Sequence, residues 1–162
     1  PMKIGLLSDT HSYLHPDISI YFKNCDEIWH AGDIGNLNCL KELKNYKKLR
    51  AVYGNIDNDI IRKETKEYLF FSIDGLRFLI IHIAGSPPQY NLKTKKLIKN
   101  FKPDILICGH SHILKIKKDF ENDLLYINPG SCGKIGFHKK KTILRFKVEN
   151  KKIKNLEAIE LN

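Results

Sequence analysis

The stretch Lys3-Ile4-Gly5-Leu6-Leu7-Ser8-Asp9-Thr10-His11 decides the fold that we predict for this chain. Its first five residues predict a buried strand, which stops at a polar turn that presents the Asp9 carboxylate and the His11 imidazole two residues apart. A strand that carries such a pair at its carboxyl end places oxygen and nitrogen ligands in the crevice of an α/β fold. Asp-x-His is common by chance, so the prediction depends on matching residues at other strand ends.

The chain beyond this stretch alternates between helix and strand as far as Tyr53. In order, we predict a helix, a strand, a helix and a strand over Pro16–Asn24, Glu27–Ala31, Asn36–Asn45 and Lys48–Tyr53. Together with the first strand, this rhythm is typical of a parallel α/β half. The carboxyl ends of parallel strands gather along one edge, so polar residues that follow the strands are expected to converge there. These residues are Asp9, His11, Asp33 and Asn55.

After Tyr53 the pattern changes to mostly strands. Strands over Glu67–Ile73 and Leu76–Ile81 are joined by Asp74-Gly75, a strong hairpin signal. A basic amphipathic helix and five strands follow, the last four strands being expected to be antiparallel: Thr94–Phe101, then Ile105–Cys108, Lys115–Phe120, Leu124–Asn128, Thr142–Val148 and Lys152–Ile159. We therefore predict one α/β domain over residues 1–162, a β-sandwich of two packed sheets flanked by helices. Pro1, which precedes Met2, is expected to be left over from expression.

The composition predicts a globular protein with a lysine-loaded surface. The 162 residues are 42% hydrophobic and 28% charged, with a formal net charge of +10. No apolar run approaches the ~20 residues of a membrane span, and no signal peptide is recognised. The four cysteines lack a Cys-x-x-Cys spacing and are expected to be reduced thiols, so we expect a cytoplasmic protein that binds no membrane.

The positive charge does not by itself indicate a nucleic-acid partner. The lysine runs Lys139–Lys141 and Lys151-Lys152 have no interleaved aromatic residues, so we expect a solvated face rather than a nucleic-acid groove. A positive field still favours a small anionic phosphate substrate. A homo-oligomer is compatible with the sequence.

Seven metal-binding side chains stand at the ends of predicted strands. They are Asp9, His11, Asp33, Asn55, His82, His110 and His112. This mixture of carboxylate, amide and imidazole ligands suits Mn²⁺, Fe²⁺, Zn²⁺ or Ni²⁺ better than Ca²⁺ or Mg²⁺. The set is large enough for two ions, which need a bridging carboxylate, and Asp33 on its Gly-Asp turn is the natural bridge.

The motifs resemble, in order, the signature of the calcineurin-like metallophosphoesterase superfamily. They are Asp9-Thr10-His11, Gly32-Asp33, Gly54-Asn55, His82 and Gly109-His110-Ser111-His112. The short length and the segment Asn128-Pro129-Gly130-Ser131 look most like the small bacterial and archaeal YfcE/MJ0936-type phosphodiesterases. The resemblance implies a four-layer α/β/β/α fold and metal-dependent hydrolysis of a small phosphate ester, most of all a phosphodiester. It also implies two divalent ions, with Mn²⁺ foremost and Fe, Zn or Ni as alternatives.

The resemblance also implies a role for each ligand. One ion would take Asp9, His11, Asp33 and His112, and the other would take Asp33, Asn55, His82 and His110. A hydroxide bridging the ions would attack phosphorus in line with the leaving oxygen. Asn55 and His82 would belong to the catalytic centre, and Asn55 and His110 would also contact the substrate phosphate.

The chain departs from the family pattern at two places. Many members carry a histidine after Gly-Asn that protonates the leaving group, and here that position is Ile56, followed by Asp57. The proton for the leaving group is then expected to come from Asp57, from a water or from the substrate. If Asp57 is not this acid, we expect it to be a supporting or turn carboxylate. The other departure is His82-Ile83-Ala84-Gly85, where His-Gly is usual, so the substrate shape is expected to differ.

Two other functions fit the same fold. A non-catalytic, Vps29-like scaffold would have lost ligands, whereas all seven positions here hold competent ones. A nuclease would need aromatic platforms near the loops, and these are lacking. Of the other histidines, we expect His30 to be structural and His15 and His138 to be surface residues, although His138 beside Lys139 is placed to touch a substrate phosphate.

Overall fold

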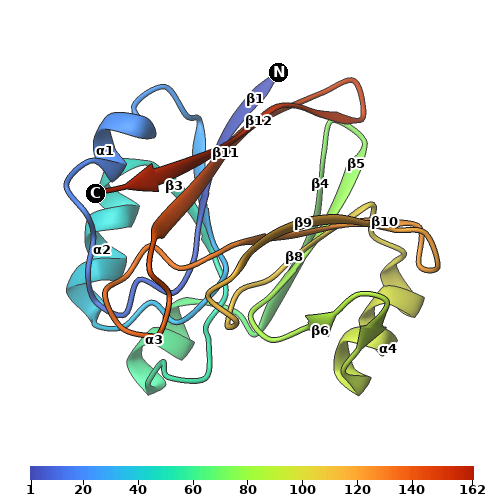
Figure 1. Ribbon diagram of the computed structural model, residues 1–162, viewed down its shortest axis with the longest axis horizontal. Helices are drawn as coiled ribbons and strands as arrows, with labels where there is room; N and C mark the ends of the chain where they lie inside the picture. Colours follow the sequence, from blue (N-terminus) through green and yellow to red (C-terminus); the bar gives the residue numbers. More distant parts are fainter.

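Two five-stranded sheets pack face to face in the computed structural model, which describes residues 1–162 (Figure 1). The strands of the first sheet are β1 (Met2–Leu7), β2 (Glu27–His30), β3 (Lys48–Ala51), β11 (Lys141–Glu149) and β12 (Lys152–Leu161). Their order is β12-β11-β1-β2-β3. As the strand–helix rhythm predicts, β1, β2 and β3 are parallel, and β11 pairs antiparallel with both β1 and β12.

The second sheet is also mixed. Its strands are β4 (Tyr68–Ile73), β5 (Leu76–Ile81), β8 (Ile105–Ile107), β9 (Leu114–Asp119) and β10 (Leu124–Pro129), in the order β4-β5-β8-β10-β9. The predicted β4–β5 hairpin is confirmed, with Asp74 and Gly75 both at positive φ in its turn. A small ribbon of β6 (Gly85–Ser86) and β7 (Gln89–Tyr90) lies in the loop after β5.

Helices cover the outer faces of the sheets. They are α1 (Ile18–Tyr21), α2 (Leu37–Tyr46), α3 (Asp59–Glu64) and α4 (Leu92–Phe101). Figure 1 shows α1 and α2 on the outer side of the first sheet and α4 beside the second. Asn36, Asn58 and Asn91 cap α2, α3 and α4, each accepting a hydrogen bond from the backbone N–H three residues later. None of the helices has the length and apolar content needed to cross a membrane.

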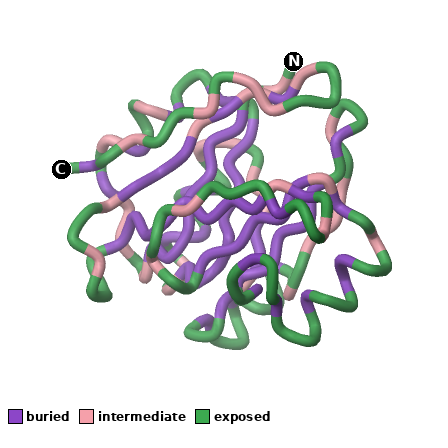
Figure 2. The backbone as a smooth tube through the Cα atoms, turned by 45° about the vertical axis from the view of Figure 1, so that its right-hand side comes forward, coloured by how far each residue is buried: buried purple, intermediate pink, exposed green.

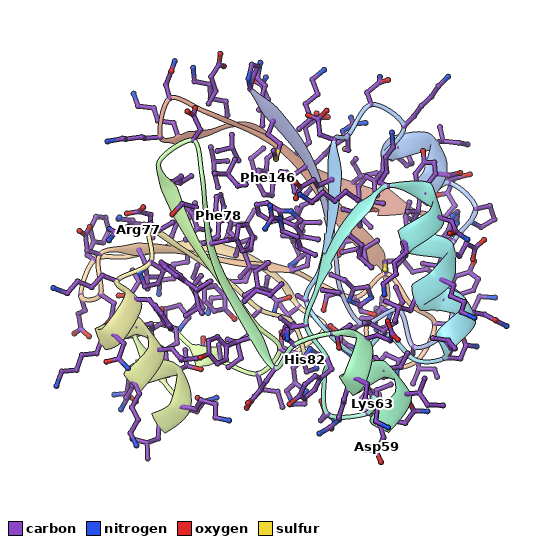
Figure 3. All side chains as sticks on the ribbon, turned by 180° about the vertical axis from the view of Figure 1, so that it is seen from behind. Asp59, Lys63, Arg77, Phe78, His82 and Phe146 are labelled. Carbon is purple, nitrogen blue, oxygen red and sulfur yellow. The ribbon has the colours of Figure 1, made fainter.

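The main core lies between the two sheets. The ring of Trp29 in β2 packs edge-on against Phe78 of β5 and Phe146 of β11, with centroid separations of 4.8 and 5.7 Å. Figure 3 shows Phe78 and Phe146 in the space between the sheets, and Figure 2 shows that the buried backbone follows the strands. This packing fixes the sheets relative to each other, and therefore fixes the loops at their edges.

The structure corrects several predicted elements. The helix expected over Pro16–Asn24 is wrong in length, because only α1 forms before the chain turns to place Asp26 N–H on the carbonyl of Lys3. The helix α3 was not predicted, since two adjacent isoleucines give it almost no apolar periodicity. The expectation that the last four strands are antiparallel is wrong for β10, which pairs parallel with β8 as well as antiparallel with β9.

Candidate metal centre

All seven predicted ligands lie in loops at one edge of the molecule. Five strands from both sheets deliver them: Asp9 and His11 follow β1, Asp33 follows β2, Asn55 follows β3, His82 follows β5, and His110 and His112 follow β8. Figure 3 shows His82 at the end of β5, close to α3. The potential ligand atoms form two groups, each within 4.8 Å of one another: Asp9, His11 and His112, and then Asp33, His82 and His110.

The loops after β1 and β2 are tied together through their backbones. The N–H of Asp9 donates to the carbonyl of Gly32 at 2.9 Å, and the N–H of His11 donates to the carbonyl of Asp33 at 3.1 Å. Five of the seven ligand residues adopt left-handed backbone conformations, with φ between 47° and 72°: Asp9, His11, Asp33, His110 and His112. Such conformations cost on the order of 1–3 kcal/mol each and cluster at functional sites. The loops are therefore strained in order to aim their side chains.

Two glycines allow the loops to approach the carboxylates. A Cβ at Gly54 would lie 2.1 Å from Oδ1 of Asp33, and a Cβ at Gly109 would lie 2.1 Å from Oγ of Ser8 and 2.8 Å from Oδ2 of Asp9. No side chain fits at either position, so the Gly-Asn and Gly-His motifs need their glycines for close contact.

In both Asp9 and Asp33, one carboxylate oxygen accepts hydrogen bonds from the protein and the other faces imidazole nitrogens. Oδ2 of Asp9 accepts from the hydroxyl of Ser8 at 2.7 Å and from the N–H of His110 at 3.1 Å. Its other oxygen, Oδ1, accepts no hydrogen bond and lies 3.2 Å from Nε2 of His112 and 3.9 Å from Nε2 of His11. The anchored side fixes the direction of the free oxygen.

Asp33 belongs to the second group and also approaches the first. Its Oδ1 accepts from the N–H of Ile56 at 3.1 Å. Its Oδ2 lies 3.4 Å from Nε2 of His11, in one group, and 3.2 Å from Nε2 of His82, in the other. Asn55 joins the second group, because its Oδ1 lies 3.1 Å from Nδ1 of His110.

The donor set fits divalent cations. Nδ1 of His82 donates to the carbonyl of Ala31 at 2.8 Å, so Nε2 of the neutral ring is a lone pair facing carboxylate oxygen. Three of the four buried side-chain atoms without a hydrogen-bond partner are at this site: Oδ1 of Asp9, Nε2 of His11 and Nε2 of His82. Buried acceptors that converge on each other need a positive charge between them. A proton or a metal ion supplies it.

The pKa directions agree with this arrangement. The Asp9 carboxylate raises the pKa of His112, against a smaller effect of burial. Burial opposes protonation of His82, but the carboxylates of Asp33 and Asp9 outweigh it and raise the pKa of that ring. Burial also opposes ionisation of Asp33, yet the nearby imidazoles hold its pKa below the usual range. A metal ion bound here would replace the proton that these groups share.

His30 is a structural residue of the site, as expected. The N–H of Gly32 donates to Nδ1 of His30 at 3.0 Å, so the Nε2–H of His30 donates to Oγ1 of Thr10, also at 3.0 Å. Thr10 in turn donates to the carbonyl of Ile34 at 2.7 Å. Both ring nitrogens are used, and this buried ring therefore links the loops that carry Asp9 and Asp33.

Asp57 faces the loops rather than open space. It is 4% exposed, and its oxygens accept from the N–H groups of Ile34 at 3.1 Å, Gly35 at 2.9 Å and Gly54 at 2.8 Å. These three backbone donors use most of the hydrogen-bonding capacity of the carboxylate. Of the two roles expected for Asp57, the geometry favours the turn carboxylate.

His138 lies at the site, although the sequence predicted a surface role. Its Nε2–H donates to the carbonyl of Gly133 at 2.8 Å, and its Nδ1 lies 3.2 Å from Nδ1 of His112. In the neutral ring Nδ1 must then accept from His112, which leaves Nε2 of His112 as the lone pair directed at the centre. In the sequence, only the glycines of the loop before His138 hint at this contact. Position 136 needs glycine, because a Cβ there would lie 2.3 Å from the ring of His112.

The segment Asn128-Pro129-Gly130-Ser131 braces the site without entering it. The amide of Asn128 donates to the carbonyl of Gly109 at 3.1 Å, and the hydroxyl of Ser131 donates to the carbonyl of Asp9 at 3.0 Å. These bonds join the loops after β1 and β8, which come from different sheets.

Comparisons with known proteins identify relatives of this chain. A family model described as the calcineurin-like phosphoesterase superfamily domain matches residues 2–151. The chain is also 36% identical over 166 residues to the probable metallophosphoesterase MJ0623 of Methanocaldococcus jannaschii, covering 98% of this chain and 82% of that protein.

Solved structures give the same picture of the fold. An archaeal phosphodiesterase matches with a TM-score of 0.75 and 30% identity, over 99% of this chain and 100% of that one. Vps29 of Chaetomium thermophilum matches with a TM-score of 0.78 and 13% identity, over 99% and 97% of the two chains. At that identity the second match shows a common fold alone.

Proposed function

Because the chain belongs to the calcineurin-like phosphoesterase superfamily, we propose that it is a metal-dependent hydrolase of phosphate esters, with a phosphodiester as its favoured substrate. The two groups of ligand atoms, with Oδ2 of Asp33 facing an imidazole from each, carry this proposal. The similarity to an archaeal phosphodiesterase supports the choice of a diester.

We propose two ions, each held by residues from both sheets. Asp9, His11, Asp33 and His112 would hold one, and Asp33, Asn55, His82 and His110 would hold the other. Bound divalent ions lower the pKa of a coordinated water and neutralise charge on phosphoryl oxygens. Imidazoles and carboxylates in this mixture favour Mn²⁺, with Fe²⁺, Zn²⁺ and Ni²⁺ as alternatives.

The protein's own groups would hold and orient the phosphate. Asn55 and His110 are exposed, unlike Asp9, Asp33 and His82, so their side chains are the ones that a substrate reaches. The Nδ2 of Asn55 can donate to a phosphoryl oxygen while its Oδ1 faces the second ion site. The net charge of +10 favours the approach of an anionic substrate.

Protonation of the leaving group is assigned to solvent. No histidine occupies position 56, and the oxygens of Asp57 are occupied by backbone donors. Loss of a general acid slows substrates with poor leaving groups most. The proposed enzyme is therefore expected to favour activated esters.

The experiment that tests this function is the hydrolysis of bis(p-nitrophenyl) phosphate by chelated protein to which Mn²⁺ is returned. We expect no turnover after chelation and recovery as Mn²⁺ is added. A non-catalytic scaffold on the same fold predicts no turnover with Mn²⁺, Fe²⁺, Zn²⁺ or Ni²⁺. That result would remove the enzyme proposal.

A further inference from the structure

A cavity of about 390 Å³ opens beside the second group of ligands. Asn55 and His82 line it, whereas no residue of the group formed by Asp9, His11 and His112 does. The cavity therefore continues the proposed phosphate site in one direction only. Its volume lies at the lower end of the range for small-molecule sites, about 300–1,000 Å³.

The exposed lining of the cavity is largely apolar. Ile81, Ile83 and the ring of Tyr53 line it. The guanidinium of Arg62 lies 4.6 Å from the centroid of the Tyr53 ring and fixes that ring from one side. Ile83 is 40% exposed, which leaves its side chain open to a ligand.

The charged side chains around the cavity already have partners within the protein. The Nε–H of Arg62 donates to the carbonyl of Asp57 at 2.7 Å, and its Nη2 reaches the carbonyl of Gly54. Lys93 forms an ion pair with Glu67. A second anionic group would compete with Glu67 for Lys93, whereas an uncharged ring would leave this ion pair and the hydrogen bonds of Arg62 in place.

We propose that this cavity is the subsite for the ester group of the substrate, and that it takes a planar aromatic or heteroaromatic ring. The inference rests on the proposed function, because the ester group must be attached to a phosphate held by Asn55 and the neighbouring ligands. The family resemblance leads one to expect glycine at position 83. The Ile83 side chain is therefore a part of the cavity wall that a relative with glycine there would lack. Ile83 is therefore a specificity-determining residue.

The test is calorimetric binding of two phosphonates to the Mn²⁺-loaded protein. Phenylphosphonate and methylphosphonate carry the same anionic group, have no ester bond to hydrolyse, and differ only in the group that would enter the cavity. We expect phenylphosphonate to bind roughly tenfold more tightly, the lower end of what an apolar pocket discriminates. Ile83→Ala should bring the ratio of the two Kd values close to one and leave the Kd of methylphosphonate within about twofold.

Ile113→Ala is the matched control, because Ile113 also follows a ligand histidine and is exposed but lies outside the cavity. It should leave the ratio unchanged. Ile83→Trp, which fills the cavity instead of enlarging it, should weaken phenylphosphonate alone. Equal affinities of the wild-type protein for the two phosphonates, or loss of the ratio in Ile113→Ala, would overturn the subsite while methylphosphonate binding still supports the phosphate site. Failure of both ligands to bind would overturn the proposed function as well.

Discussion

At the scale of single residues, the orientation of two ligand imidazoles depends on the ring nitrogen that points away from the site. Nδ1 of His82 bonds a backbone carbonyl and Nδ1 of His112 bonds His138, and these bonds direct both Nε2 atoms inward. The sequence predicted the inward-facing residues, because each follows a strand in a recognisable motif. It did not predict His138, whose contact depends on how a loop 26 residues away folds back.

We predict that His138→Ala lowers the affinity for one of the two metal ions by about 10–100-fold, the usual effect of losing the partner of a ligand histidine. Isothermal titration with Mn²⁺ measures this directly. His138→Asn keeps an acceptor near the position of Nδ1 and should recover part of the affinity. His15→Ala is the control, because the His15 ring also bonds a backbone carbonyl, that of Asn162, but lies away from the site. Similar losses in His138→Ala and His15→Ala would contradict the positioning role.

Acid should destabilise the metal-free protein through His30. Burial, ahead of the nearby charges, lowers the pKa of His30 to about 3, against ~6.5 in an unfolded chain. Between these values the unfolded chain binds a proton that the folded protein does not. The free energy of unfolding therefore falls as pH drops from about 6.5 towards 3, by up to about 1.4 kcal/mol per pH unit from this residue.

Urea unfolding after chelation, at several pH values between 7 and 4, measures that slope. His30→Asn removes the titrating ring but keeps an acceptor for the N–H of Gly32. We expect the variant to be less stable at pH 7 and to lose less stability on acidification. Identical slopes for the two proteins would show that His30 does not carry the effect.

At the scale of elements, the strands were predictable and the short helices were not. Continuous apolar runs such as Ile105–Ile107 and the Asp74-Gly75 turn indicate strands from local sequence alone. In contrast, α3 has six residues, and its cap at Asn58 is its clearest signal. Tertiary contacts decide where it lies: Arg62 of α3 bonds the carbonyl of Asp57 and reaches those of Gly54 and Asn55. Helix α3 therefore holds the loop that carries Asn55.

We predict that Arg62→Met lowers the affinity for the ion proposed at Asn55 several-fold and destabilises the protein by about 1–2 kcal/mol, since a charged donor to three carbonyls is lost together with its contact to the Tyr53 ring. Metal titration and urea unfolding test the two effects. Arg77→Met removes a comparable guanidinium that bonds Asp104 at the opposite end of β5. It should leave metal affinity unchanged; a matching loss of affinity in that variant would refute the link through α3.

At the scale of the whole molecule, the site exists only because two sheets meet. The first sheet supplies Asp9, His11, Asp33 and Asn55, and the second supplies the remaining histidines. The sequence predicted both sheets and their shared edge, because the Asp-x-His, Gly-Asp and Gly-His-x-His motifs all follow strands. It could not predict which strands pair across the chain, such as β11 with β1, since pairing depends on packing around Trp29.

The central claim is that Asp33 serves both ion sites, and the number of Mn²⁺ ions bound per chain tests it most directly. Elemental analysis after loading and dialysis should find two ions per chain in the wild-type protein and in Asp123→Asn, an exposed control carboxylate. Asp33→Asn should hold fewer than two ions and lose phosphodiester hydrolysis. Two ions in Asp33→Asn with turnover intact, or a single ion in the wild-type protein, would contradict the account.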